Sequence, residues 1–238
     1  MISLDFGLRL NGIALAGFCV IGATIGLPAA AQTSPSAIET GQYQGLHAAA
    51  QKGDVAQIEK LAAAKAALNA RDGNGRTPLH VATFARQRDA IRALVNAGAD
   101  INLLDNDRYD GITIASVADD EETLRVLLTL GANAKLITSR YDGTALIAAA
   151  HLGHDGVIKQ LIAAGAPLDH VNNLHWTALI ESIVLGNGGA RHQECLRALL
   201  AAGASHRLTD RQGTTPLQLA KSRGYREMVQ MLEHSGAR

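Results

Sequence analysis

The chain has 238 residues, and its 22 Lys and Arg side chains balance 22 Asp and Glu side chains. Because a nucleic-acid-binding protein needs an excess of positive charge on one face, this balance argues against nucleic acid as a partner. Apolar residues make up 47% of the chain but aromatic residues only 3%, so we expect an interior of Ala, Leu, Ile and Val between closely packed helices.

Residues 1–31 predict a leader for export. Residues 13–27 carry no charge, and small side chains follow at Ala29 and Ala31. About 15 apolar residues are too few to span a bilayer comfortably. We therefore expect a signal peptide (1–31) that is removed after Ala31, with an uncleaved anchor as the alternative, followed by a linker at 32–44. The mature chain would be periplasmic or secreted, with no membrane segment.

Cleavage of the leader would leave Cys195 as the only cysteine. An exported chain with one cysteine has no internal disulfide and must be stabilised by packing. Cys195 falls at an apolar helical spacing beside Leu196 and Leu199, which indicates a buried structural thiol.

Residues from about 45 onward form a set of repeats with a nearly fixed period. When Thr77, Asp110, Thr144, Thr177 and Thr215 are taken as equivalent, the steps between them are 33, 34, 33 and 38 residues. The distance from each of them to the glycine that closes its repeat is 21 residues, except in the fifth unit, where it is 26. The fifth unit therefore carries an insertion. A fixed period of this length indicates a stack of small units.

Each unit is predicted to contain two short helices. Thr77 stands where a helix N-cap is needed, and Pro78 occupies the next position, where a missing N–H costs nothing. In the second unit one helix is expected from about Pro78 to Phe84, and a second helix buries Leu94 and stops at Gly98. Such a unit has apolar residues on two sides and cannot hide them alone, so the units must stack.

This pattern resembles the ankyrin repeat, whose most specific signature is the Thr-Pro-Leu-His box at residues 77–80. The resemblance covers residues 45–238 as six units, at about 45–72, 73–105, 106–139, 140–172, 173–210 and 211–238. It implies an all-α solenoid of six stacked helix-turn-helix units with projecting β-hairpin-like loops. The first unit lacks Thr-Pro, as expected of an amino-terminal cap. The third has Asp110 and Gly111 instead, and Asp is an adequate N-cap.

His80 and His47 are interpreted as scaffold. In the ankyrin family the histidine of this box bonds to neighbouring backbone and holds the turn in place. The equivalent positions in the other units are Thr113, Ile147, Ile180 and Gln218. A role that accepts isoleucine in two units is not catalysis.

Four histidines within a short stretch, His151, His154, His170 and His175, support an alternative hypothesis of a metal-binding or small enzymatic protein. Imidazole is a common zinc ligand, and residues three apart on a helix share one face. The repeat register places the two pairs in different parts of the unit, so surface histidines are the preferred interpretation, and no metal or cofactor is expected.

Two further stretches are not interpreted as catalytic or ligand-binding sites. The glycine-rich residues 186–195 lack the Lys-Ser/Thr of a phosphate-binding loop, so we expect a flexible extension between the two helices of the fifth unit. The acidic residues 119–122 are expected to open a second helix, where acids complement the helix dipole.

The resemblance implies a binding surface in place of an active site. Ankyrin proteins hold partners along a concave side formed by the loop tips and the first helices of the units. Trp, Tyr and Arg are the usual anchors of an interface. The candidate partner-binding residues at these positions are Arg76, Phe84, Arg108, Tyr109, Arg140, Tyr141, His151, His175, Trp176 and Arg211. Packing between adjacent loops is the alternative role for these side chains.

We therefore expect a non-enzymatic protein-binding module of the periplasm that is monomeric by itself. Exported bacterial proteins that resemble this chain include accessory partners of enzymes such as catalases and immunity partners that block a toxin. A structural spacer without a specific partner is a further alternative.

Overall fold

The computed structural model describes residues 32–237, so the expected signal peptide at 1–31 lies outside the described residues. The described part contains thirteen helices and no strand, and its one isolated β-bridge joins Thr138 and Gly143. None of these helices combines the length and the apolar character that crossing a membrane requires. The expected all-α class is confirmed for this part of the chain.

Twelve of the helices form six pairs, each with a first and a second helix. The pairs are α2 (Gly45–Lys52) with α3 (Val55–Ala63), α4 (Pro78–Phe84) with α5 (Arg88–Asn96), α6 (Gly111–Val117) with α7 (Glu121–Thr129), α8 (Ala145–Leu152) with α9 (Asp155–Ala163), α10 (Ala178–Val184) with α11 (Ala190–Ala201), and α12 (Pro216–Ser222) with α13 (Arg226–His234).

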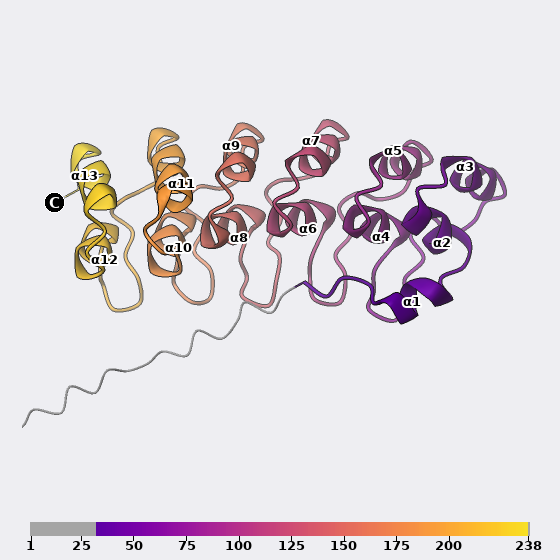
Figure 1. Cartoon of the computed structure of the whole chain (residues 1–238), viewed down its shortest axis with the longest axis horizontal. Coiled ribbons are helices and arrows are strands. Elements are labelled where there is room, and N and C mark those ends of the chain that lie inside the picture. The colour runs from indigo at the N-terminus through magenta and orange to yellow at the C-terminus, as the bar shows by residue number, and fades with distance from the viewer. Residues whose placement is uncertain (1–31, 238) are drawn as a thin grey trace, which may run out of the picture. The chain divides into compact units, whose positions relative to one another are not determined.

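The six pairs stand side by side in one row (Figure 1). Each first helix packs against its own second helix and against the first helix of the next pair, and the second helices also pack in sequence. The loops between pairs project from the side of the row where the first helices lie. The predicted stack of six units is confirmed, and each unit shares its apolar surface only with its neighbours.

The core is built from aliphatic side chains, as the low aromatic content predicts. In the fourth unit Leu146 of α8 packs with Ile158 and Leu161 of α9, and all three are fully buried. Burying a Leu or Ile side chain contributes about 1.5–3 kcal/mol, so each unit is stabilised by a few such residues. Cys195 is also fully buried, and burial raises the pKa of its thiol to about 12.

The predicted N-caps hold the start of each first helix after α2. Their side-chain oxygens accept a hydrogen bond from the backbone N–H three residues ahead, at Thr77, Asp110, Thr144, Thr177 and Thr215. Such a cap satisfies one of the four N–H groups that a helix leaves without an internal partner. The expected cap at Asp110 is therefore confirmed together with the four threonines.

The insertion in the fifth unit differs from the expected flexible extension. Residues 190–195 of the glycine-rich stretch at 186–195 belong to α11, which has 12 residues where the other second helices have nine. The remainder is held by a neighbouring unit, since the Tyr225 hydroxyl donates to the Gly186 carbonyl (3.0 Å). Within α11, His192 Nε2 donates to the His151 carbonyl (3.0 Å). Part of the insertion therefore lengthens a helix.

The segment at 32–44, expected as a linker, contains the short helix α1 (Ala37–Gln42). A capping box between Ser36 and Glu39 begins this helix, and none of its residues is buried. Glu39 forms an ion pair with Arg76 of the second unit. Polar contacts therefore hold α1 against the repeats.

Candidate functional site

The five loops between pairs share one geometry. In each loop the residue at the start donates its backbone N–H to the carbonyl of the residue near the end, in the pairs 72–76, 105–109, 138–143, 172–176 and 210–214. Successive loops are also joined, for example by the Asn106 N–H to the Asn74 carbonyl (3.0 Å) and the Asn173 N–H to the Tyr141 carbonyl (2.9 Å). We call these loops, together with the last turns of the first helices, the loop face.

His80 ties the loop face to the helices, as predicted for scaffold. Its Nδ1 accepts from the Thr77 N–H (3.1 Å), and its Nε2 donates to the carbonyl of Tyr109 in the next loop (3.0 Å). His47 makes the same contact one unit earlier, to the carbonyl of Arg76 (3.0 Å). Burial lowers the pKa of His80, which favours the neutral ring that this bonding requires. His80 therefore holds the spacing between adjacent loops.

The other nine candidate residues lie on the loop face, and they differ in how exposed they are. Four of them are exposed: Arg108, Arg140, His175 and Arg211. Five are half-buried: Phe84, Tyr109, Tyr141, His151 and Trp176. None of these nine side chains lies in the core.

Arg76 was predicted to bind a partner, but it is only 1% exposed. Its Nε donates to Asp72 Oδ2 (2.7 Å), its Nη2 pairs with Glu39, and its Nη1 donates to the carbonyl of Thr33 (3.2 Å). These bonds use the guanidinium within the chain. Arg76 is closed to a partner while residues 33–39 lie in place.

The exposed arginines of the loop face connect neighbouring loops. Arg108 pairs with Asp142 (2.7 Å), and Arg211 Nη2 donates to the carbonyl of Asn173 (2.8 Å). Exposed ion pairs of this kind contribute little stability, so both arginines can exchange these contacts for others. In the structure these arginines therefore take the alternative role, which is packing between adjacent loops.

Exposed apolar side chains concentrate in one part of the chain. Six large apolar residues of the described part are more than a third exposed, and five of them fall between residues 137 and 185. Two come from the loop before α10, Val171 and Leu174, at 39% each. Leu152 is the last residue of α8 and is 39% exposed. Leu185 directly follows α10 and is 38% exposed. Four of these five residues belong to the fourth and fifth units, and Ile137 belongs to the end of the third, so the fourth and fifth units present an apolar loop face.

The fifth unit also contains a buried acid. Glu181 on α10 is 4% exposed, and its Oε1 accepts from Asn172 Nδ2 (2.8 Å). Its other oxygen, Oε2, lies 3.6 Å from Nδ1 of the half-buried His151 at the end of α8. Burial raises the pKa of Glu181 to about 7, and the bond from Asn172 opposes that rise. Burial likewise lowers the pKa of His151, so both groups are biased toward their uncharged forms.

The other units show that Asn172 and Glu181 belong together. At the start of three other loops an aspartate accepts two backbone N–H groups on Oδ1, at Asp72, Asp105 and Asp210. Asn172 keeps this role, because its Oδ1 accepts the N–H groups of the residues two and four positions ahead (3.0 Å each). Only an amide can also donate to Glu181 while doing so. The asparagine thus satisfies a carboxyl that an aspartate would leave without a donor.

Sequence reasoning missed this pair, although the repeats contain the signal. The positions equivalent to Glu181 in the other units after the first hold only apolar residues, Val81, Ile114, Ala148 and Leu219. Aligning the units column by column would have marked the acid as an exception.

The histidines of the metal hypothesis bond mainly to backbone. His154 Nδ1 lies 2.8 Å from the carbonyl of Ser116, and His170 Nε2 lies 2.6 Å from the carbonyl of Asp142. Among residues 32–237 no group of three or more His, Cys, Asp or Glu side chains is placed to hold a metal ion. The acidic stretch at 119–122 starts α7 as expected, with Asp120 as its N-cap.

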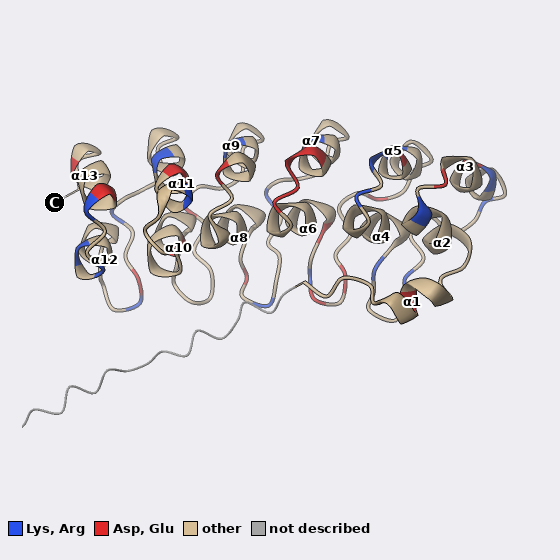
Figure 2. Ribbon diagram, viewed as in Figure 1, with Lys and Arg blue, Asp and Glu red and all other residues tan. Residues whose placement is uncertain are grey.

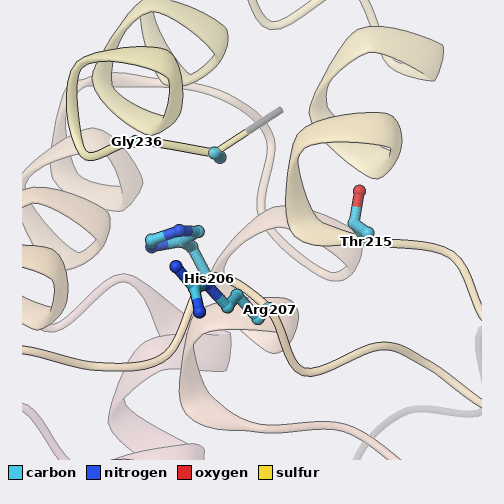
Figure 3. A pocket seen from close by; sticks show the side chains of 5 residues that line it. His206, Arg207, Thr215 and Gly236 are labelled. Carbon is cyan, nitrogen blue, oxygen red and sulfur yellow. The ribbon is translucent and has the colours of Figure 1, made fainter.

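Charges of both signs are spread along the row of helix pairs (Figure 2). A polar hollow of about 490 Å³ lies at the carboxyl-terminal unit, where His206 and Arg207 extend toward Gly236 and the Thr215 hydroxyl lies across from them (Figure 3).

Comparison with known proteins gives the family. A model of ankyrin repeats in three copies matches residues 30–107 and 112–207, and a model of ankyrin repeats in many copies matches residues 189–233. The chain is 41% identical over 100 residues to the ankyrin repeat protein YahD of Escherichia coli (strain K12), which is 42% of this chain and 50% of YahD. It is 34% identical over 97 residues to an ankyrin repeat-containing protein of Treponema pallidum (strain Nichols), covering 40% of this chain and 31% of that protein.

Solved structures agree with these matches. An ankyrin repeat domain from Acinetobacter baumannii AYE is 45% identical with a TM-score of 0.77, over 81% of this chain and 98% of that one. The ankyrin repeat domain of Bcl-3, a member of the IkappaB protein family, is 27% identical with a TM-score of 0.74, over 83% and 88% of the two chains. Ankyrin repeats are protein–protein interaction modules, and this chain belongs to the ankyrin repeat family.

Proposed function

We propose that the chain is an exported, non-enzymatic module that binds one partner protein through the loop face of its fourth and fifth units. The observation that carries this proposal is the concentration of exposed apolar residues between residues 137 and 185. A contiguous apolar patch on a protein surface is typical of an interaction site. The half-buried Trp176 within this region supplies the kind of side chain that often dominates binding energy.

The export half of the proposal rests on the amino-terminal pattern, with cleavage after Ala31. The partner would then be met outside the cytoplasm. We propose an enzyme as that partner, either one that the chain assists, such as a catalase, or a toxin that the chain blocks. An assisted enzyme keeps its activity in the complex and a blocked toxin loses it, so an activity measurement on the purified complex separates the two.

The test is capture of the partner with matched variants of the mature chain. Leu152→Ser and Leu185→Ser together should reduce the affinity at least tenfold, because they remove apolar area from the proposed centre of the interface. Ile38→Ser is the control, since Ile38 is the most exposed of the large apolar side chains (74%) and lies on α1. Cross-linking in the extracytoplasmic fraction followed by mass spectrometry identifies the captured protein.

Trp176→Ala provides a second, graded readout. Truncating an interface tryptophan costs about 1–4 kcal/mol of binding free energy, and the fold should remain intact because this residue is only half-buried. Equal capture by wild type, the double serine variant and Trp176→Ala would exclude the fourth and fifth units as the binding site. If the chain stays in the cytoplasm with its leader attached, export is contradicted, but the binding proposal is not.

A further inference from the structure

The first described residues lie against the second unit of the stack. The Thr33 carbonyl accepts from Arg76 Nη1 (3.2 Å), and Glu39 of α1 pairs with Nη2 of the same guanidinium. Asn74 Nδ2 also donates to Glu39 Oε1 (2.7 Å). Hydrogen bonds from the backbone and side chain of Ser36, and then from Arg76, lower the pKa of Glu39 to about 2. This carboxylate therefore stays ionised, and the contact persists, throughout the physiological pH range.

Residues 32–42, which we call the amino-terminal strap, follow the loops of the first units (Figure 1). None of the residues of α1 is buried, and the strap is attached by its polar contacts to Arg76 and Asn74. It begins at Gln32, whose side chain is half-buried.

Gln32 has one feature that a folded chain normally avoids. Its side-chain Nε2 is buried and has no hydrogen-bond partner among residues 32–237. A buried donor without an acceptor costs free energy, because it has lost its bonds to water. The backbone carbonyl of the same residue, in contrast, accepts from the Ser34 N–H (3.1 Å).

We infer that Gln32 is a modification site and becomes pyroglutamate in the mature chain, an inference that rests on the proposed cleavage after Ala31. Cleavage makes the nitrogen of Gln32 a free α-amine. An α-amine has a pKa of about 7.7–8.0, so part of it is the uncharged nucleophile at neutral pH. The amine attacks the side-chain carbonyl carbon Cδ, the N–Cδ bond forms, the Cδ–Nε2 bond breaks, and ammonia leaves with the proton that the amine gives up.

Ring closure removes the buried amide donor that has no partner and keeps the two carbonyl groups that accept hydrogen bonds. The nitrogen that leaves as ammonia is the buried Nε2 without a partner. The carbonyls of Gln32 and Thr33, which accept from Ser34 and Arg76, take no part in the ring closure. The product is a five-membered lactam without charge, joined to a strap whose contacts begin at the next residue.

The modification would also fix which part of the loop face is open. A closed, uncharged end resists aminopeptidases, so the strap stays long enough to hold Arg76, which is 1% exposed beneath it. Arg76 then remains closed to a partner, which leaves the apolar loops of the fourth and fifth units for binding.

The test uses the chain from Gln32 to its end, released from a ubiquitin-like fusion whose protease leaves no extra residue. After incubation in neutral buffer, intact mass spectrometry should show the loss of one ammonia, and the chain should become resistant to aminopeptidase. Gln32→Ser is the matched control, because serine has no side-chain carbonyl to attack, and it should keep its amine and stay sensitive.

A free peptide of residues 32–44 sets the time scale for ring closure. If the folded chain still carries a free amine when the peptide has cyclised completely, docking protects Gln32 and the inference is wrong. The precursor expressed with its leader tests export separately. A leader that is retained, or removed elsewhere, contradicts the proposed export, while the fusion-derived chain still decides whether Gln32 cyclises.

Discussion

Replacing Glu181 by glutamine should change how stability depends on pH. Burial raises the pKa of Glu181 from 4.5 to about 7. A carboxyl with a raised pKa keeps its proton in the folded chain while the unfolded chain has already lost it. Stability is therefore complete below about pH 4.5, falls between about pH 4.5 and pH 7, and stays at the lower level above that window.

The size of the effect follows from the shift. One pKa unit corresponds to about 1.36 kcal/mol, so the shift of Glu181 amounts to about 3 kcal/mol of unfolding free energy lost by neutral pH. Glutamine has the shape of the protonated acid and an oxygen that can accept from Asn172. Glu181→Gln should match wild type near pH 4 and be more stable by up to about 3 kcal/mol near pH 8.

The assay is urea unfolding followed by circular dichroism at several pH values. Glu59→Gln, on the exposed side of α3, is the matched control and should leave the pH profile unchanged. The titratable group beside Glu181 is His151 on α8, whose pKa His192 and His154 lower electrostatically. All three histidines remain in the variant, so the difference between the two proteins isolates the acid. A difference that is constant from about pH 4 to pH 8 would refute a buried, protonated Glu181.

Substitutions at four other positions test the stack by the same unfolding measurement. Leu161→Ala should cost about 2–5 kcal/mol by leaving a cavity in a central unit, and Leu232→Ala in the terminal unit should cost less, because α13 has a neighbour on one side only; equal losses would argue against the unit boundaries. Thr144→Ala should cost about 1 kcal/mol by removing the N-cap of α8; an unchanged midpoint would mean that water replaces the cap. His80→Leu should cost about 1–3 kcal/mol by leaving two backbone groups without partners, whereas His80→Gln should cost less, since Gln218 caps α12 from this position.

The sequence was sufficient for the units because their plan is local. An N-cap at Thr77 and the helix that follows depend on residues within a few positions, and the same pattern recurs along the chain. The predicted helix from about Pro78 to Phe84 has those bounds in the structure. The scaffold role of His80 was also predictable, because equivalent positions can be compared within one sequence.

Contacts between units were not predictable in the same way. Arg76 was expected at an interface because of its loop position, but its partner Glu39 lies 37 residues earlier, in a segment outside the repeat pattern. The glycines of residues 186–195 predict a flexible extension, yet residues 190–195 belong to α11. Local patterns do not say which side chain of one unit reaches the next.

Glu181 connects the stability of the stack to the proposed binding face. An apolar side chain at this position serves the other units, so the acid is not needed to build the fold, and its burial costs stability near neutral pH. In a stack of repeats such a cost is confined to one unit and its neighbours, so the intact units on either side can tolerate it. Asn172 lowers the cost by donating a hydrogen bond to the buried carboxyl. The unit that carries this cost also bears Leu174, Trp176 and Leu185 on its loop face, which supports a fifth unit shaped for contact with a partner more than for stability.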